Sequence, residues 1–260
     1  MSELEPALSR FDRRASSYED SPLQEFLFVP VQQTALRFAL RLLPQAQSVL
    51  DVGCGTGRLL RHARPCFPTA ELVGVDLAGR MVATAMAMTP TELAVRYVHA
   101  RAERLPFANG VFELAFATLS LRHWTNLPAG IAELARVLTP GGVVVLADVF
   151  SSDRRRGSAV HVLRRRRHNL VPAELDTVLA SHRLEVIGCE HVRWFGLPDV
   201  QVVAVRQQRR ASAKPPRPGT RPASLRRISP RPGPRASPQQ PHRDRDHDQP
   251  NSERVPGNQL

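Results

Sequence analysis

Residues 49–60 read "VLDVGCGTGRLL" and contain the clearest structural signal in the sequence. The stretch begins with apolar, β-prone residues, which predict a buried strand. Three glycines follow within five positions, at 53, 55 and 57, and a helical pattern resumes at Arg58. Glycines let the backbone turn tightly and approach a ligand closely, and the start of the next helix offers free N–H groups. The stretch therefore predicts a strand, a ligand-binding turn and a helix, although several cofactors fit such a turn.

The positive charge of the chain is concentrated in two segments. The 260 residues carry a net charge of +12, but residues 206–260 alone hold 13 Lys/Arg against 4 Asp/Glu, and residues 153–169 hold 7 Arg against 1 Asp. Residues 206–260 also contain 11 of the 23 prolines and no aromatic residue. Such a segment buries too little apolar surface to offset its ordering entropy. We therefore expect a nearly neutral folded core and a disordered Arg/Pro-rich tail over residues 207–260.

A basic tail can bind nucleic acid or acidic partners. This one lacks the aromatic residues on which single-stranded nucleic acids stack, so we expect a solvated extension rather than a nucleic-acid-binding segment. The three cysteines, at 54, 66 and 189, form no CxxC pair and no metal-binding spacing. No apolar run approaches the ~20 residues of a membrane span, and the N-terminal residues lack the apolar core of a signal peptide. These features predict a cytoplasmic protein with reduced thiols and no metal.

Strand and helix patterns alternate along the chain. We expect strands at residues 48–51, 71–76, 94–100, 111–118, 143–149, 184–192 and 200–205. Expected helices cover residues 23–43 with a break near Pro30, and 56–63, 78–88, 127–138 and 172–182, while residues 140–142 ("PGG") are expected to form a turn. This alternation predicts an α/β fold, a Rossmann-like doubly wound sheet of seven strands, mostly parallel, with an antiparallel C-terminal edge strand. The predicted organisation is a helical cap over residues 1–47, a main domain over residues 48–206 with a basic loop at 150–170, and the tail.

Two carboxylates distinguish among the possible cofactors. Ligands of such sheets bind beyond the carboxyl ends of the strands, where Asp51 and Asp76 are expected. Asp76 follows the glycines by about 20 residues, which suits the hydroxyls of a ribose. A dinucleotide needs Gly-x-Gly-x-x-Gly, whereas this turn reads Gly-x-Gly-x-Gly, and Asp51 would sit poorly beside a pyrophosphate. S-adenosylmethionine carries an ammonium, a sulfonium and a ribose but no phosphate, so it fits better than NAD, which remains the alternative for an oxidoreductase.

Four motifs resemble those of class I S-adenosylmethionine-dependent methyltransferases of the methyltransferase type 11 family. They are "VLDVGCGTGRLL", "LVGVDLAGRMV", "RAERLPFANGVFELAFATLSLRHW" and "ELARVLTPGGVVVLADV", and they cover residues 49–149 in the family's order. The opening "FDRRASSYED", residues 11–20, is also similar to the family's N-terminal segment. One departure is Glu113, where the family usually has Asp, at a position that supports the fold more than the chemistry.

The resemblance implies a methyltransferase that uses S-adenosylmethionine and acts on a small molecule. It implies contacts with the methionine end from the turn after the first strand, with the ribose and adenine from the end of the second strand, with the adenine edge after the third strand, and with the sulfonium side after the fourth. Carried onto this sequence, these residues are Asp51, Val52, Gly53, Cys54 and Gly55, then Asp76 and Leu77, then Ala102 and Glu103, then Thr118 and Leu119, with Tyr18 closing over the cofactor.

The acceptor side is less defined. His123 follows the fourth strand, where acceptor and sulfonium should meet, and we expect it to pack or to orient the acceptor rather than to act as a general base. Asp148, at the end of the fifth strand, is a weaker candidate for acceptor contact. Methyl transfer mainly needs alignment in a dry site, so the lack of an obvious catalytic pair does not oppose this reading.

Apolar residues in 11–43 suggest an acceptor with an apolar body. We expect the arginines at 154–156 and 164–167 to form a solvated basic lid or, in the other reading, to contact an anionic portion of the acceptor. The alternatives are a nucleic-acid-associated methyltransferase or binding protein that uses the basic tail, and a degenerate methyltransferase that binds the cofactor without chemistry. We expect a monomer or a homodimer.

Overall fold

The computed structural model describes residue 19 and residues 24–149, 172–193 and 200–208. Within them, seven strands form one sheet in the order β3-β2-β1-β4-β5-β7-β6. The strands are β1 (Ser48–Val52), β2 (Glu71–Asp76), β3 (Val95–His99), β4 (Phe112–Thr118), β5 (Leu138–Val149), β6 (Leu184–Val192) and β7 (Val200–Gln207). Strands β1 to β5 pair in parallel, while β7 is antiparallel to both β5 and β6. This confirms the predicted Rossmann-like, mostly parallel sheet; its antiparallel strand β7 lies one place in from the edge strand β6.

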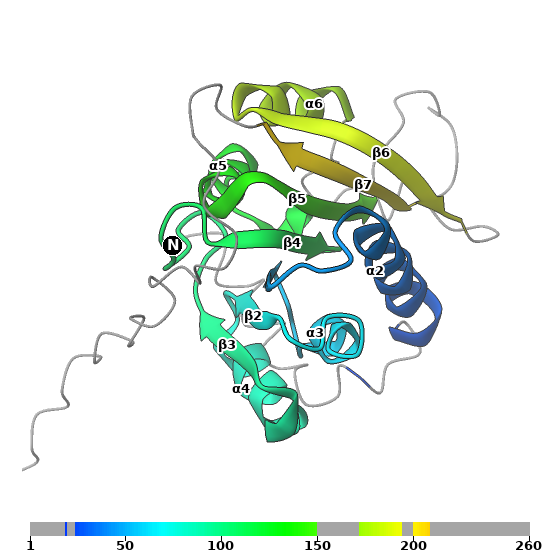
Figure 1. Ribbon diagram of the computed structural model, residues 1–260, viewed down its shortest axis with the longest axis vertical. Helices are drawn as coiled ribbons and strands as arrows, with labels where there is room; N and C mark the ends of the chain where they lie inside the picture. Colours follow the sequence, from blue (N-terminus) through cyan, green and yellow to red (C-terminus); the bar gives the residue numbers. More distant parts are fainter. Residues whose placement is uncertain (1–18, 20–23, 150–171, 194–199, 209–260) are drawn as a thin grey trace, which may run out of the picture. The chain divides into compact units, whose positions relative to one another are not determined.

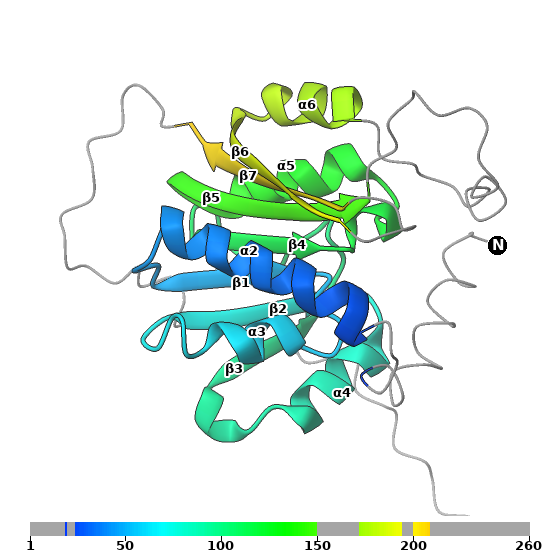
Figure 2. The ribbon, with the colours of Figure 1, turned by 90° about the vertical axis from the view of Figure 1, so that its right-hand side faces the viewer.

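Helices cover both faces of the sheet. They are α2 (Val29–Leu42), α3 (Arg58–Ala63), α4 (Gly79–Met88), α5 (Leu127–Val137) and α6 (Pro172–Ser181). Figures 1 and 2 show α2 and α3 on one face and α5 on the other. Residues 143–147 of β5 alternate between the two sides and are fully buried on both, with Val143 and Val145 in the same core cluster as α2 and α3. Burial on both faces explains why β5 reads as a continuous apolar run.

Two expected boundaries move for local backbone reasons. The helix expected from residue 23 is an α-helix only from Val29, after a π-helical turn at Gln24–Phe28. Pro30 stands in the first turn of α2, where its missing N–H costs no hydrogen bond. The helix expected from residue 56 begins at Arg58, because Gly57 has a φ of 81° and cannot continue a right-handed helix.

The turn expected at residues 140–142 is wrong, because these residues lie inside β5. The pairing of β5 with β4 shifts at this point: Phe112 is opposite Leu138, but Leu114 is opposite Val143. A bulge of this kind accommodates extra residues without ending the strand. The expected tail and basic loop lie outside the described residues, apart from Gln207, which ends β7, and Gln208.

In the part of the chain that the structure describes, no helix has the length and apolar character needed to cross a membrane.

Gly74, in the middle of β2, allows the strand to pack closely against its neighbours. A Cβ atom there would lie 2.7 Å from Cδ1 of Tyr97 and 2.9 Å from Sγ of Cys54. We expect Gly74→Ala to lower the free energy of unfolding by about 1–3 kcal/mol, because the added methyl group overpacks the core. Urea denaturation of the purified protein measures the change.

The matched control is Gly79→Ala, at the first position of α4. A Cβ atom there meets nothing closer than 3.8 Å, on the ring of His99. Because alanine favours helix over glycine by up to about 1 kcal/mol, this variant should be as stable as the wild type or more so. Equal stability losses in the two variants would contradict the packing described here.

Candidate cofactor and acceptor site

The turn after β1 is fixed by packing on two sides and is open between them. A Cβ atom at Gly53 would lie 2.4 Å from Cβ of Ser120, and one at Gly57 would lie 2.2 Å from the hydroxyl oxygen of Tyr97. At Gly55, by contrast, no atom of the described residues lies within 4 Å of such a Cβ position. All three glycines have positive φ, between 54° and 81°. The turn is therefore held rigidly at its ends, and its middle leaves room for a ligand to approach the backbone.

Backbone hydrogen bonds tie this turn to β2. The N–H groups of Gly53 and Cys54 both donate to the carbonyl oxygen of Val75, at 2.7 and 3.0 Å. This places the open side of the turn beside the end of β2, which terminates at Asp76.

Asp51 is a buried carboxyl group whose Oδ1 has no partner among the described residues. Asp51 is 1% exposed and stands next to the last residue of β1, a strand that is buried throughout. Burial, reinforced by the nearby charge of Asp76, raises the pKa of Asp51 from its ordinary value of 3.8 to about 8. A buried acceptor without a partner carries a desolvation cost that a cationic ligand would relieve.

Asp76 binds the glycine turn directly. Its Oδ2 accepts a hydrogen bond from the N–H of Gly55 at 2.8 Å, and its Oδ1 accepts one from the N–H of Ala78 at 2.8 Å. Burial raises the pKa of Asp76, while these two hydrogen bonds act in the opposite direction. Each carboxylate oxygen keeps a second lone pair, so the group can still accept hydrogen bonds from the hydroxyls of a ribose.

Two more of the predicted residues are described. Leu77 directly follows Asp76 in the chain, and Ala102 follows the neighbouring strand β3. Leu77 is half-buried, and its carbonyl oxygen lies 2.8 Å from Nε2 of His99 at the end of β3. Ala102 is buried in the turn that follows β3. The structure thus brings Asp51, Gly55, Asp76 and their neighbours together at the carboxyl ends of β1, β2 and β3.

Glu103 is engaged by the protein backbone. Its Oε1 accepts hydrogen bonds from the N–H groups of Thr125 at 2.6 Å and Asn126 at 3.0 Å, just before α5. Burial alone would raise its pKa, but these and other hydrogen bonds, with the charge of Arg101, hold the pKa of Glu103 below its ordinary value. Its predicted contact with the cofactor stays a prediction.

The end of β4 carries a strained backbone. Leu119, directly after the buried Thr118, has a φ of 54°, and its N–H donates to the carbonyl oxygen of Ala147 at 2.6 Å. A residue other than glycine in this region costs on the order of 1–3 kcal/mol and is concentrated at functional sites. The following Ser120 donates its hydroxyl to the carbonyl oxygen of Val52 at 2.9 Å, which joins the ends of β4 and β1.

The two acceptor-side candidates differ in exposure. His123 is exposed at the end of a short 3₁₀ turn, whereas its neighbour Trp124 is buried against Gly130. Asp148 is fully buried and pairs with Arg122, whose Nη1 lies 3.2 Å from Oδ1. Burial raises the pKa of Asp148, and the charge of Arg122 opposes that rise. The role of His123 toward the acceptor stays a prediction, and the carboxylate of Asp148 already has a cationic partner.

Sequence reasoning missed the anchoring of Glu19. This carboxylate accepts a hydrogen bond from the hydroxyl of Thr56 at 2.7 Å and pairs with Arg58 and Arg61 at the start of α3. Burial acts to raise its pKa, but the hydrogen bonds from Thr56 and Arg61 leave the pKa of Glu19 lowered. The sequence signal was the pair of arginines three residues apart after the glycines. Tyr18, predicted to close over the cofactor, lies outside the described residues.

Residues 50–146, which are 97 of the chain's 260 residues, match the model of the methyltransferase domain family. The resemblance to class I S-adenosylmethionine-dependent methyltransferases is thereby confirmed.

Curated relatives include several named methyltransferases. O-methyltransferase cnsE of Penicillium expansum is 32% identical over 138 residues, which are 52% of this chain and 50% of the relative. Malonyl-[acyl-carrier protein] O-methyltransferase of Pectobacterium atrosepticum is 31% identical over 53% of this chain and 50% of its own length. Demethylmenaquinone methyltransferase of Thermus thermophilus is 34% identical over 45% of this chain and 53% of its own length. The chain thus spans about half the length of the curated relatives that it matches.

Solved structures share the fold at low identity. A chain from the complex of the Haloferax volcanii Trm112 methyltransferase activator with a methyltransferase has a TM-score of 0.63 and 17% identity, covering 76% of this chain and 97% of that chain. Geranyl diphosphate C-methyltransferase of Streptomyces coelicolor, solved with S-adenosyl-L-homocysteine, has a TM-score of 0.58 and 17% identity. The match covers 68% of this chain and 79% of that chain. The [4+2]-cyclase SpnF has a TM-score of 0.58 and 19% identity, and the match covers 68% of this chain and 81% of that chain. Since a cyclase is among them, the fold alone does not define the reaction.

The raised pKa of Asp51 predicts how stability without ligand depends on pH. Between about pH 4 and pH 8 the folded protein keeps a proton on this group that the unfolded chain releases. The stability from this group is therefore complete below about pH 4 and is lost as the pH rises through about 8. We expect Asp51→Asn to gain melting temperature over the wild type progressively from pH 5 to pH 8, as measured by calorimetry. A difference that is constant across this range would contradict the assignment.

Proposed function

We propose that this protein transfers a methyl group from S-adenosylmethionine to a small-molecule acceptor. The observation that carries the proposal is Oδ1 of the buried Asp51, which has no hydrogen-bond partner in the described part of the chain and lies near the open backbone at Gly55 and the carboxylate of Asp76. The family match of residues 50–146 supports the same cofactor.

The two carboxyl groups of the site fit S-adenosylmethionine by charge and by hydrogen bonding. The ammonium of the amino-acid end supplies the cation that Asp51 lacks, and the ribose hydroxyls supply donors for Asp76. The open side at Gly55 lets the cofactor pass close to the backbone between these two anchors. A pyrophosphate would instead face two carboxyl groups, so the same charges disfavour NAD.

When bound, S-adenosylmethionine supplies an electrophilic methyl group on a sulfonium whose departure leaves a neutral thioether. The chain's own contribution is to hold the cofactor at both ends and to align the acceptor beyond it. The buried Thr118 and the strained Leu119 form the end of β4, where they exclude water from the methyl side. His123 orients the acceptor, or takes its proton when the nucleophile is a hydroxyl or amine.

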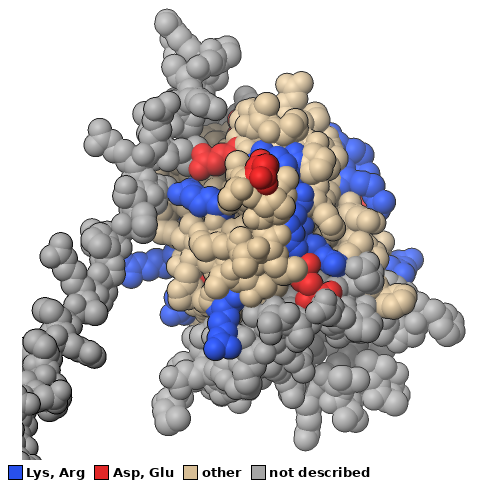
Figure 3. Space-filling view, turned by 90° about the horizontal axis from the view of Figure 1, so that it is seen from below, with Lys and Arg blue, Asp and Glu red and all other residues tan. Residues whose placement is uncertain are grey.

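The acceptor is a small molecule with an apolar body. The names of two relatives contain malonyl-[acyl-carrier protein] and demethylmenaquinone, which differ in kind, and neither selects the acceptor of this protein. The nucleic-acid alternative depends on the basic tail, which lies outside the described residues apart from Gln207 and Gln208. On the face that Figure 3 shows, the described basic side chains stand at separate places with other residues between them.

The test is calorimetric titration of S-adenosylmethionine and, separately, NAD into the folded protein. We expect binding of S-adenosylmethionine at micromolar concentrations and none of NAD. Asp76→Asn should weaken this binding at least ~10-fold, or ~1.4 kcal/mol, because the amide removes the charge that attracts the ribose hydroxyls. The matched control is Asp176→Asn, the same chemical change on the exposed surface of α6, which should bind like the wild type. Absence of S-adenosylmethionine binding by folded wild type, or equal binding of NAD, would refute the proposal.

A further inference from the structure

Glu103 connects two loops that follow different strands. It lies in the turn after β3, yet its Oε1 accepts hydrogen bonds from the N–H groups of Thr125 and Asn126. These two residues belong to the connection between β4 and α5, just before the helix begins. The Glu103 side chain is only 11% exposed. Two hydrogen bonds to one ionised and largely buried oxygen form a strong and geometrically specific link.

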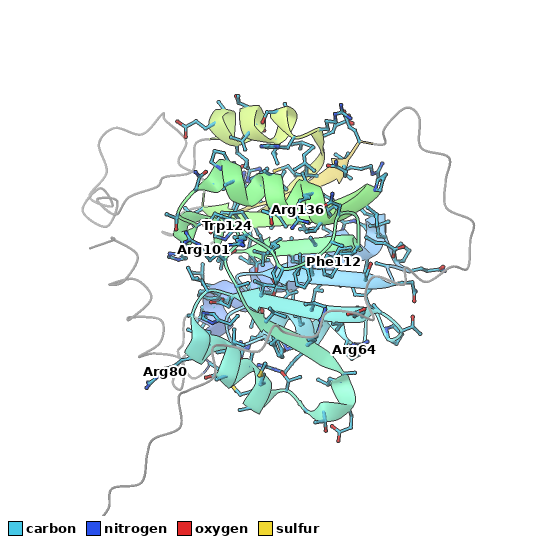
Figure 4. All side chains as sticks on the ribbon, turned by 90° about the vertical axis from the view of Figure 1, so that its left-hand side faces the viewer. Arg64, Arg80, Arg101, Phe112, Trp124 and Arg136 are labelled. Atoms are coloured by element: carbon cyan, nitrogen blue, oxygen red, sulfur yellow. The ribbon has the colours of Figure 1, made fainter. Side chains whose placement is uncertain are left out.

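Arg101 reinforces the same link. Its Nη2 donates to the hydroxyl of Thr125 at 3.3 Å, and its Nε lies 3.5 Å from Oε2 of Glu103. The turn itself is closed by the N–H of Arg104, which donates to the carbonyl oxygen of Arg101 at 3.1 Å. Figure 4 shows Arg101 beside the buried Trp124 at one end of the sheet, consistent with this contact between the loops. Both loops are therefore held at the carboxyl end of the sheet by side chains from one of them.

Each loop carries one side of the proposed site. The first contains Ala102, expected at the adenine edge of the cofactor. The second runs from the strained Leu119 through His123 to Trp124 and is expected to face the acceptor. A link between them fixes the loop at the adenine edge, here called the adenine wall, relative to the loop on the acceptor side before any ligand binds. This lowers the entropic cost of ordering the site on binding.

We infer that Glu103 is a positioning residue, which shapes the adenine side of the site through the N–H groups of Thr125 and Asn126 rather than by touching the cofactor. This inference rests on the proposed function and assigns to Glu103 a role in that same site. In the competing role, the carboxylate of Glu103 accepts a hydrogen bond directly from the cofactor.

Thr125→Pro separates these two roles, because it deletes one N–H donor and leaves the Glu103 side chain in place. The preceding residue, Trp124, has φ −72° and ψ 139°, a backbone conformation that a residue before proline favours. Thr125→Val is the matched control, since it keeps the N–H and removes only the hydroxyl.

The experiment measures binding of S-adenosyl-L-homocysteine and of S-ribosyl-L-homocysteine, which lacks the adenine, to each full-length variant by calorimetry. We expect Thr125→Pro and Glu103→Ala each to weaken S-adenosyl-L-homocysteine binding at least ~10-fold, with no further loss in the double variant, because both break one link. Glu103→Gln keeps an acceptor oxygen and should stay within about 3-fold of the wild type, as should Thr125→Val.

Binding of S-ribosyl-L-homocysteine should change little, because only the adenine wall is displaced. Melting temperatures identify any variant that fails to fold, and the comparison of Glu103→Ala with Glu103→Gln then tests the inference without Thr125→Pro. Wild-type affinity in folded Thr125→Pro together with a loss in Glu103→Ala would overturn the inference in favour of direct contact. Equal losses for both ligands would also overturn it, and a wild type that binds neither would overturn the proposed function with it.

Discussion

The site is organised around Asp51, a buried carboxyl group whose Oδ1 has no hydrogen-bond partner among the described residues. Asp51 lies in a strand with no exposed residue, its Oδ1 accepts no hydrogen bond among the described residues, and Asp76 adds a second carboxylate nearby. Leaving such a group unsatisfied costs stability, so its position is best explained by a ligand that supplies the missing charge. The ammonium of S-adenosylmethionine meets that requirement, and phosphates do not.

The surrounding structure keeps this constraint in place. The glycine turn is packed against Ser120 from β4's end and against Tyr97 from β3, so it cannot widen or collapse without displacing neighbouring strands. Asp76 then binds the N–H of Gly55 from the next strand. The parallel strand order brings these groups from separate parts of the chain to one edge of the sheet. The site is thus preorganised by the same contacts that hold the sheet together.

The sequence predicted the fold because its signals are local. Apolar runs, helical periodicity and the three glycines each depend on neighbouring residues, and they located all seven strands. The turn expected at residues 140–142 was wrong because β5 pairs with β4 at Leu138 and again from Val143, so that Pro140 stays within a bulged strand, and that pairing is not visible locally. Likewise, the partners of Glu103 lie 22 and 23 residues away, and those of Glu19 more than 35. A motif shows where a carboxylate stands in the sequence. Which backbone N–H groups donate hydrogen bonds to it depends on how the loops fold.

The number of protons released when S-adenosylmethionine binds tests the role of Asp51. Calorimetric titrations at pH 7 in two buffers of different ionisation enthalpy give this number. Because the pKa of Asp51 is raised to about 8 in the ligand-free protein, binding of the ammonium should ionise this group and release close to one proton. Asp51→Asn should release none. Binding by the wild type without proton release, or the same release from Asp51→Asn, would contradict the claim that Asp51 receives the cationic end of the cofactor.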